Sequence, residues 1–350
     1  MYFKDEKVLI IGHTGFKGSW LTNWLDLYGA RIYGISKFSI NMSFNYKCIN
    51  SKKILIKEFD FDIRDYKKLK KTINNIKPKY IFFLAAQSLV GDSYLKPKET
   101  WSINLIGALN FLEVVKQIKF RSNIIIITSD KCYLNVEKKT GYKETDMLGG
   151  TDPYSASKAS IEILYKSYFE SFLKFKKNIC SSTARAGNVI GGGDLSKNRI
   201  VADAIKSWKN KIKLKLRNPK STRPWQHVLE PLSGYLKLSQ YLNNGKLNGT
   251  SFNFGPSVKN SKTVIKLIKE MSKHLDNFEF NISNKNIFQE HKLLQLNCTE
   301  AKKKLKWKPR LNFKETVSFT TDWYIEKFKN KKKDMRKFNI KQIEKFMKYD

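Results

Sequence analysis

The chain has 350 residues, of which 41% are hydrophobic, and a formal net charge of +36. This length and apolar content exclude a globally disordered chain and fit one large domain, or two domains that share a cleft. No run of 18 apolar residues occurs, the N-terminus lacks a secretory-signal pattern, and the four cysteines have neither disulfide-framework nor metal-ligand spacing. We therefore expect a soluble, reduced, cytoplasmic protein without a bound metal or a membrane partner.

The positive charge taken alone favours a polyanionic partner such as nucleic acid. Only nine of the 67 basic residues are arginine, however, and the lysines are spread through the chain. Surfaces that read bases or bind phosphates bidentately favour arginine. We interpret the charge as a compositional bias on a solvated surface and expect no nucleic-acid partner. The rare arginines are then expected where the shape of the guanidinium group is needed.

Apolar runs alternate with amphipathic segments through the first half of the chain. The predicted strands are Lys7–Ile11, Arg31–Ser36, Tyr80–Ala85, Asn123–Thr128 and Cys180–Arg185. The predicted helices are Trp20–Tyr28, Asp65–Ile76, Asn104–Val115 and Ser155–Leu173. This alternation predicts an α/β fold with a doubly wound, parallel, Rossmann-type sheet and right-handed crossovers.

The alternation loosens after about Gly191. We predict a dinucleotide-binding domain over residues 1–188, completed by a segment around 226–254. Residues 189–350 are predicted to form mainly a smaller α/β substrate-binding lobe and C-terminal helices. Helical spacing in the lysine-rich tail, residues 327–350, favours a docked surface helix.

Three glycines, Gly12, Gly15 and Gly18, lie between the first predicted strand and the first predicted helix. Glycine at this spacing lets the backbone approach a pyrophosphate, whose charge then meets the helix N-terminus. Chance predicts only about 0.05 such motifs in a chain of this composition. The spacing is typical of extended short-chain dehydrogenases. The residues of this turn predicted to bind the cofactor are Gly12, Thr14, Gly15, Phe16, Lys17 and Gly18.

Tyr154 and Lys158 form one of four Tyr-x-x-x-Lys matches, where about three are expected by chance. Only this pair opens a long predicted helix after a buried strand, and its i, i+4 spacing places both side chains on one helix face. A phenol with a pKa of about 10 is a poor base at neutral pH. A nearby ammonium group and a cationic nicotinamide are expected to lower that pKa, so Tyr154 is the predicted base. Lys158 is also expected to hold the nicotinamide ribose.

Ser129, Asp130 and Lys131 follow the most apolar predicted strand, and Asp130 and Lys131 add an acid and a second base. This inventory suits dehydration of a hexose. Tyr154 takes the proton of the C4 hydroxyl as hydride leaves C4. Lys131 then removes the C5 proton while Asp130 protonates the departing C6 hydroxyl, and hydride returns to C6. The predicted catalytic residues are Tyr154, Lys158, Ser129, Asp130 and Lys131.

With these residues placed, the sequence resembles the CDP-glucose 4,6-dehydratases over nearly its whole length. The motifs that carry the resemblance, in the family's order, include Gly12-His-Thr-Gly-Phe-Lys-Gly-Ser-Trp-Leu21, Thr128-Ser-Asp-Lys-Cys-Tyr133, Asp152-Pro-Tyr-Ser-Ala-Ser-Lys158, Arg185-Ala-Gly-Asn-Val-Ile-Gly-Gly-Gly-Asp194 and Arg223-Pro-Trp-Gln-His-Val-Leu-Glu-Pro-Leu-Ser-Gly-Tyr235. Other hexose dehydratases carry Asp-Glu where this chain has Asp130-Lys131. The resemblance implies a hydro-lyase that converts CDP-glucose to CDP-4-dehydro-6-deoxyglucose and water. Such a product serves deoxysugar synthesis for surface polysaccharide, including lipopolysaccharide O-antigen.

The resemblance also implies further site residues. Those expected at the cofactor, besides the glycine turn, Tyr154 and Lys158, are Asp62, Ile63, Leu84, Ala85, Ala86, Gln87, Asn104 and Thr128. Those expected at the substrate are Asn188, Arg199, Arg217, Arg223 and His227, with the arginines on the diphosphate. A lone histidine is more often structural. The family also implies a homodimer or higher homo-oligomer formed through two long helices, for which the predicted helices at Asn104 and Ser155 are candidates.

The resemblance favours NAD as the cofactor. An NAD-selective fold usually places an acid about 20 residues beyond the glycine turn, on the ribose hydroxyls. Here Ile35-Ser-Lys37-Phe38 has no acid, and Lys37 suits the 2′-phosphate of NADP, so both cofactors stay open.

Two other readings of the sequence remain open. One is a nucleotide-sugar 4-epimerase or a dehydratase for another nucleotide hexose. Replacing the Asp130-Lys131 pair separates the epimerase from a dehydratase, because an epimerase would hardly be affected. The other is a basic nucleic-acid-binding protein, whose binding falls steeply with salt.

Overall fold

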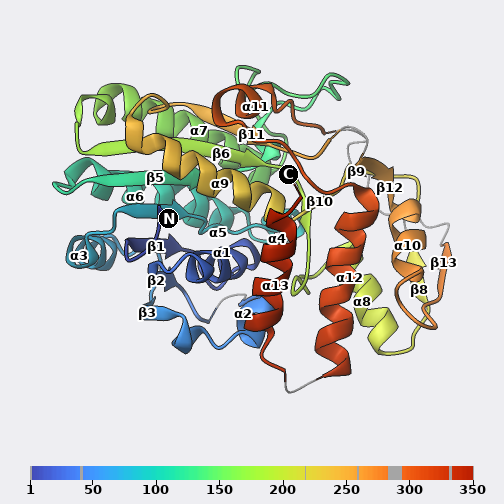
Figure 1. Ribbon diagram of the computed structural model, residues 1–350. Helices are drawn as coiled ribbons and strands as arrows, with labels where there is room; N and C mark the ends of the chain where they lie inside the picture. The colour runs from blue at the N-terminus through green and yellow to red at the C-terminus, as the bar shows by residue number, and fades with distance from the viewer. Residues whose placement is uncertain are drawn as a thin grey trace.

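The computed structural model describes residues 2–39, 42–216, 218–257, 260–282, 294–330 and 333–349. Its central feature is a parallel sheet of seven strands in the spatial order β11-β6-β5-β4-β1-β2-β3 (Figure 1). The strands are β1 (Lys7–Ile11), β2 (Arg31–Ser36), β3 (Leu55–Asp60), β4 (Tyr80–Phe83), β5 (Ser122–Ile127), β6 (Ile179–Ala186) and β11 (Ser251–Phe254). This architecture confirms the predicted doubly wound α/β fold.

Helices cover both faces of the sheet, which explains why its inner strands are apolar at nearly every position. Alternate side chains of β1, such as Leu9 and Val8, belong to two different hydrophobic clusters. One cluster joins the sheet to α3 (Tyr66–Ile76), α6 (Gly107–Gln117) and α7 (Pro153–Ser171). The other joins it to α1 (Phe16–Leu27) and α9 (Leu229–Tyr241).

Two predicted helices differ from the observed ones. The first helix begins at Phe16, four residues before the predicted Trp20, because its first turn carries Lys17, Gly18 and Ser19 and so shows no apolar repeat. The predicted helix at Asn104–Val115 is longer in the structure and is interrupted. It consists of α5 (Pro97–Trp101), the π-helical turn η2 (Ser102–Ile106) and α6.

A second lobe packs beside the sheet, on the right in Figure 1. Its short strands pair as β13 (Phe280–Ile282) with β8 (Leu214–Leu216) and β12 (Ser261–Thr263) with β9 (Thr222–Pro224). Its helices include α8 (Ile200–Lys209), α10 (Val264–Ser272) and α12 (Phe313–Lys329). Between these segments the chain returns to the sheet, where β11 pairs with β6. The domain boundaries themselves stay a prediction.

Shorter elements connect these layers. They are α2 (Phe44–Cys48), α4 (Val90–Leu95), α11 (Thr299–Leu305), β7 (Val189–Ile190), β10 (Gln226–His227), η1 (Ser51–Lys53), η3 (Asp130–Cys132), η4 (Leu173–Phe175) and η5 (Leu242–Asn244).

The C-terminal helix α13 (Met335–Met347) docks against α1, as Figure 1 shows. Ile343 and Phe346 are fully buried, and Trp24 of α1 meets Phe346 edge to face with ring centroids 5.7 Å apart. The Arg336 guanidinium donates two hydrogen bonds to the Asp26 carboxylate, from Nε (2.7 Å) and Nη2 (2.9 Å). The tail is therefore a docked surface helix. Across the described residues, no helix combines the length and the apolar character needed to span a membrane.

A buried carboxylate joins the second lobe to α9. Glu230 is 1% exposed, and its Oε1 accepts hydrogen bonds from the backbone N–H groups of Arg310 (2.9 Å) and Leu311 (2.7 Å). Burial raises the pKa of Glu230 to about 7, although these hydrogen bonds oppose the shift. The folded state therefore binds this proton more tightly than the unfolded chain does.

We predict that Glu230 makes folding stability fall as the pH rises from about 4.5 to about 7. Below this window the carboxyl is protonated in the folded and in the unfolded state, and above it the carboxyl is ionised in both. The loss of folding free energy, about 3 kcal/mol at most, is therefore complete above pH 7. The free energy of unfolding of Glu230→Gln, measured in urea, should rise relative to that of the unaltered chain between pH 5 and pH 8, because the amide does not ionise. An offset that is the same at both pH values would contradict this account.

Candidate active site

The glycine turn and the predicted catalytic residues meet at the carboxyl edge of the sheet. The strand order reverses direction between β1 and β4, and the turn after β1 lies beside the ends of β4 and β5. In open α/β sheets, ligands bind in the crevice at such a switch point.

The glycine turn has a shape that larger residues would fill. Gly12 has φ +97°, and a Cβ added to it would lie 2.7 Å from the backbone nitrogen of Ala85. A Cβ on Gly18 would overlap the carbonyl oxygen of Gly12. Gly15 is the N-cap of α1, and no side chain among the described residues caps it there. The first N–H groups of α1 therefore lie beside a close-packed backbone turn, which fits a dinucleotide pyrophosphate.

We predict that Gly12→Ala destabilises the protein and abolishes dinucleotide binding. The added methyl requires an unfavourable positive φ and a displacement of the β4 end, which together cost about 2–4 kcal/mol. Thermal unfolding and a dinucleotide titration by calorimetry measure the two effects. Gly245→Ala is the control, because Gly245 also has a positive φ (+69°) but a Cβ there has no atom within 4 Å. Equal dinucleotide affinity in the Gly12 and Gly245 variants would contradict the prediction.

The predicted adenosine end of the site is highly charged. Asp62 accepts two hydrogen bonds from the Arg64 side chain, from Nε (2.9 Å) and Nη2 (2.6 Å), and the Lys37 Nζ lies 3.5 Å from its Oδ2. These hydrogen bonds and charges lower the pKa of Asp62 to about 2. Ile63 is buried, and its side chain packs so closely on Gly107 that a Cβ there would overlap it.

No acid ends β2, as the sequence indicated. Ser36 occupies this position, and its Oγ accepts a hydrogen bond from the N–H of Thr14 (3.2 Å) and contacts Nδ1 of His13 (3.0 Å). The other ring nitrogen of His13 lies 3.1 Å from Glu58 Oε1. A buried histidine, which the sequence analysis did not single out, thus braces the glycine turn against β2 and β3.

The residues after β4 are held by the π-helical turn. Asn104, 1% exposed, accepts a hydrogen bond from the N–H of Gln87 (2.8 Å) and donates one to Ser157 Oγ in α7 (2.8 Å). Asn104 was predicted to bind the cofactor. In the structure its amide joins the β4 end to the catalytic helix, a use consistent with the tendency of π-turns to occur at functional sites. Leu84, Ala85 and Ala86 line the same strand end.

The β5 end carries the predicted acid and second base. Asp130 is 3% exposed, and its Oδ1 accepts a hydrogen bond from Ser129 Oγ (2.9 Å). Burial raises the pKa of Asp130, although Lys131, Ser129 and Lys17 oppose the shift. A carboxyl of this kind is suited to donate a proton at higher pH than free aspartic acid. Gly187, at the end of β6, leaves room for it, since a Cβ there would lie 3.3 Å from Asp130 Oδ2.

Tyr154 and Lys158 open α7 beside this strand end. Asp152 caps the helix by accepting hydrogen bonds from the N–H groups of Tyr154 and Ser155, both at 3.0 Å. The Lys158 Nζ lies 5.9 Å from the centroid of the Tyr154 ring, and both side chains are buried. The (i, i+4) pair therefore faces the site together.

The chain's own groups raise the pKa of Tyr154, and its lowering by a nicotinamide cation stays a prediction. Burial raises this pKa to about 12, and the hydrogen bond with Ser129 only partly opposes the rise. Burial also lowers the pKa of Lys158 to about 8. The predicted lowering of the Tyr154 pKa invoked a nicotinamide cation as well as Lys158, and the chain alone supplies only the lysine.

Lys17 and Arg199 also belong to this cluster. The Lys17 Nζ donates to Tyr235 OH (3.4 Å), and its pKa is lowered to about 8 by burial, against the attraction of Asp130. Arg199 forms an ion pair with Asp194 (Nε to Oδ2, 3.3 Å) and acts electrostatically on Tyr154. Lys17, which was predicted at the cofactor, thus interacts with Asp130, and Arg199, which was predicted at the substrate, interacts with Tyr154.

The other predicted substrate residues are less closely grouped. Asn188 is half-buried directly after β6, and Arg223 lies in β9 with its Nη1 on the carbonyl of Thr222 (2.9 Å). Arg217 lies outside the described residues. His227 is fully buried between the rings of Trp20 and Phe319, and burial lowers its pKa to about 3. This position favours a packing role for His227 over substrate contact.

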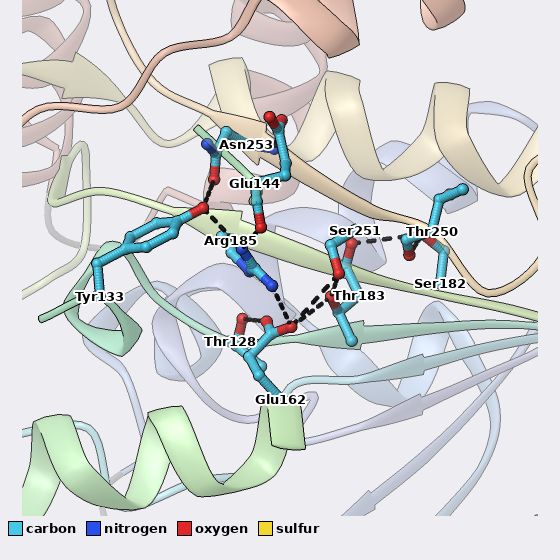
Figure 2. Close-up of polar contacts among 10 residues, drawn as sticks. All are labelled: Thr128, Tyr133, Glu144, Glu162, Ser182, Thr183, Arg185, Thr250, Ser251 and Asn253. Carbon is cyan, nitrogen blue, oxygen red and sulfur yellow. Dashed lines mark hydrogen bonds and ion pairs between the residues drawn. The ribbon is translucent and has the colours of Figure 1, made fainter. Parts of the chain in front are cut away.

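A buried polar network behind the catalytic group was not predicted as part of the site. Figure 2 shows Arg185 of β6 between Tyr133 and Glu162 of α7. Arg185 was quoted as part of a motif and as one of the rare arginines. Glu162 lies four residues beyond Lys158, but in the sequence it cannot be told apart from a solvated helix carboxylate.

The parallel sheet, the glycine turn and the Ser129–Tyr154–Lys158 group define an enzyme of the short-chain dehydrogenase/reductase class. The family model for GDP-mannose 4,6 dehydratase matches residues 9–320. The chain is 38% identical over 331 residues to the CDP-glucose 4,6-dehydratase of Salmonella typhimurium, covering 92% of this chain and 91% of that protein. The chain therefore belongs to the 4,6-dehydratase family of nucleotide-sugar enzymes.

Solved structures share the fold. The dTDP-glucose 4,6-dehydratase of Bacillus anthracis, in complex with NAD, superposes with a TM-score of 0.75 at 20% identity, covering 92% of this chain and 97% of that chain. The UDP-glucose 4-epimerase of Thermotoga maritima, with UDP-glucose, gives a TM-score of 0.77 at 21% identity, covering 92% and 99%.

Proposed function

We propose that this protein is a CDP-glucose 4,6-dehydratase, a hydro-lyase that releases water and CDP-4-dehydro-6-deoxyglucose. The observation that carries the proposal is the convergence of Ser129, Asp130, Tyr154 and Lys158 beside the glycine turn, with Lys131 next to Asp130. The relative of Salmonella typhimurium supports cytidine as the base of the sugar nucleotide.

NAD is the proposed cofactor, and the residues present fit it. Gly12, Gly15 and Gly18 provide the turn for the pyrophosphate, Asp62 and Ile63 lie at the adenosine end, and Lys158 is placed for the nicotinamide ribose. When bound, NAD supplies the hydride acceptor for C4 of the sugar and the hydride donor for C6. Lys37, which would suit a 2′-phosphate, lies 3.5 Å from the Asp62 carboxylate, and the NAD-bound dehydratase of Bacillus anthracis supports NAD over NADP.

The side chains then divide the proton transfers. Tyr154 accepts the proton of the C4 hydroxyl as its phenolate, the form that the Lys158 ammonium and a bound nicotinamide cation would favour. Loss of hydride makes C4 a ketone and acidifies the C5 proton, which Lys131 removes. Asp130, whose pKa burial raises, gives its proton to the departing C6 hydroxyl, so that water leaves, and C5 regains a proton from Lys131 when hydride reaches C6. Arg199 and Arg223, with Arg217, are the proposed ligands of the diphosphate, and Asn188 of the sugar.

Three finer points belong to the proposal. The product would enter deoxysugar synthesis for surface polysaccharide such as O-antigen. The protein would work in the cytoplasm, and as a homodimer paired through the helices at Asn104 and Ser155. Residues 189–350 would form mainly the nucleotide-sugar lobe.

The test is incubation of the purified protein with CDP-, UDP-, dTDP- and GDP-hexoses, with and without added NAD. Mass spectrometry of the sugar nucleotide and the absorbance of its 4-keto product in alkali report dehydration. The proposal predicts loss of one water from CDP-glucose, with the highest kcat/KM of the set. Dehydration of another nucleotide hexose alone would refute the cytidine assignment, and C4 inversion without loss of water would indicate an epimerase.

A further inference from the structure

The proposed catalytic group is divided between two elements of the fold. Ser129, Asp130 and Lys131 follow β5, whereas Tyr154 and Lys158 belong to α7. For dehydration, both sets must face the same hexose. Near-attack geometry is sensitive to displacements of about 1 Å, so their relative position needs support.

A buried ion pair lies directly behind both elements. Arg185 Nη2 donates to Glu162 Oε2 at 2.8 Å, and the two side chains are only 4% and 1% exposed. Glu162 follows Lys158 by one helical turn, so its carboxylate is fixed to the catalytic helix. Burial alone would lower the pKa of Arg185, but the Glu162 carboxylate outweighs it and holds that pKa above its ordinary value.

The pair reaches both ends of the catalytic strand segment. Glu162 Oε1 accepts a short hydrogen bond from Thr128 Oγ1, directly before Ser129. Arg185 Nη1 donates to Tyr133 OH at 2.7 Å, two residues after Lys131. Tyr133 OH in turn donates to Asn253 Oδ1 at 2.8 Å (Figure 2). Residues 129–132 are therefore held at both ends to one guanidinium–carboxylate pair.

The same arginine also fixes the following loop. Its Nη1 donates to the carbonyl oxygen of Glu144 (2.9 Å), and its guanidinium carbon lies 5.1 Å from the centroid of the Tyr133 ring. A lysine has one point charge and no planar fork, so it cannot reproduce these directions together. This explains an arginine here in a chain whose basic residues are nearly all lysine.

We propose that Arg185 and Glu162 are positioning residues, which set the catalytic segment 129–132 against Tyr154 and Lys158. This inference rests on the proposed function only for the identity of the reaction that is measured. Neither residue is assigned contact with substrate or cofactor.

The test compares Arg185→Lys and Tyr133→Phe with the control Arg336→Lys. Arg336 also makes a two-pronged pair, with Asp26, but joins α13 to α1 away from the site. We expect Arg185→Lys to lower kcat by about 10- to 100-fold and Tyr133→Phe by about tenfold, with KM changed by less than about threefold. Hydrogen exchange of the amides in segment 129–134 should accelerate in both variants and not in Arg336→Lys.

Tyr133→Phe keeps the proposal falsifiable if Arg185→Lys does not fold, because it removes a single oxygen. Unchanged kcat and unchanged exchange in Tyr133→Phe would overturn the proposal. So would equal losses of kcat in Arg185→Lys and Arg336→Lys. Wild-type protein inactive on CDP-glucose would instead refute the proposed function. The same comparison would then be made by exchange and by nicotinamide reduction with whichever nucleotide hexose is accepted.

Discussion

Tyr154→Phe is expected to lower the rate of dehydration by about 10³-fold or more while leaving the fold intact. The phenol oxygen is the base proposed for the C4 hydroxyl, and a positioned general base contributes about 10²–10⁴-fold. Without it, hydride cannot leave C4 and no later step begins. Both the 4-keto product and the near-ultraviolet absorbance of reduced nicotinamide should therefore be lost in single-turnover experiments.

A second tyrosine of the same helix provides the control. Tyr165 is fully buried, and its hydroxyl lies 3.0 Å from Ser181 Oγ on the core side. Tyr165→Phe removes an equivalent atom and should cost about 1 kcal/mol of stability with kcat nearly unchanged. Equal activities of the two variants would show that Tyr154 is not the base.

Asp130→Asn and Lys131→Met have the second largest expected effects. Each is expected to lower dehydration by about 10²–10³-fold but to leave C4 oxidation in place, because the acid and base of elimination act after hydride has left C4. Reduced nicotinamide should accumulate on mixing with CDP-glucose and persist. An epimerase would be nearly insensitive to both changes, so the result separates the two reactions.

Isotope exchange assigns the two roles. In deuterated water, wild-type protein should introduce deuterium at C5, and Lys131→Met should not, because Lys131 is the proposed C5 base. Lys138→Met is the control, since Lys138 pairs with Asp146 (2.7 Å) in the following loop. Loss of C4 oxidation in Asp130→Asn, or C5 exchange that survives in Lys131→Met, would contradict this division.

The fold was predictable because its signals are local. The observed β1 and β2 have the predicted bounds, since each is a short apolar run closed by a turn. The start of α1 was not predictable in the same way. Its first turn belongs to the glycine motif and therefore lacks the apolar repeat that indicates a helix. The interruption before α6 also has no periodic signal, since it depends on Asn104 joining Gln87 to Ser157.

The candidate site was predictable where its residues lie at characteristic intervals in the sequence. The glycine turn and the Tyr154–Lys158 pair depend on intervals within one segment. The pairing of Glu162 with Arg185 was not predictable from the sequence. The two residues lie more than 20 positions apart, and only the folded sheet brings β5, β6 and α7 together. The rise that burial gives to the pKa of Tyr154 was not predictable from spacing, since burial is a property of the folded site.

The measurement that most directly tests the central claim uses CDP-glucose carrying deuterium at C4. The account predicts a product lighter by one water in which the deuterium has moved to C6, because hydride removed from C4 returns to the same sugar. Loss of water with the label washed out to solvent would contradict hydride return. Retention of all atoms with inverted C4 would contradict dehydration itself.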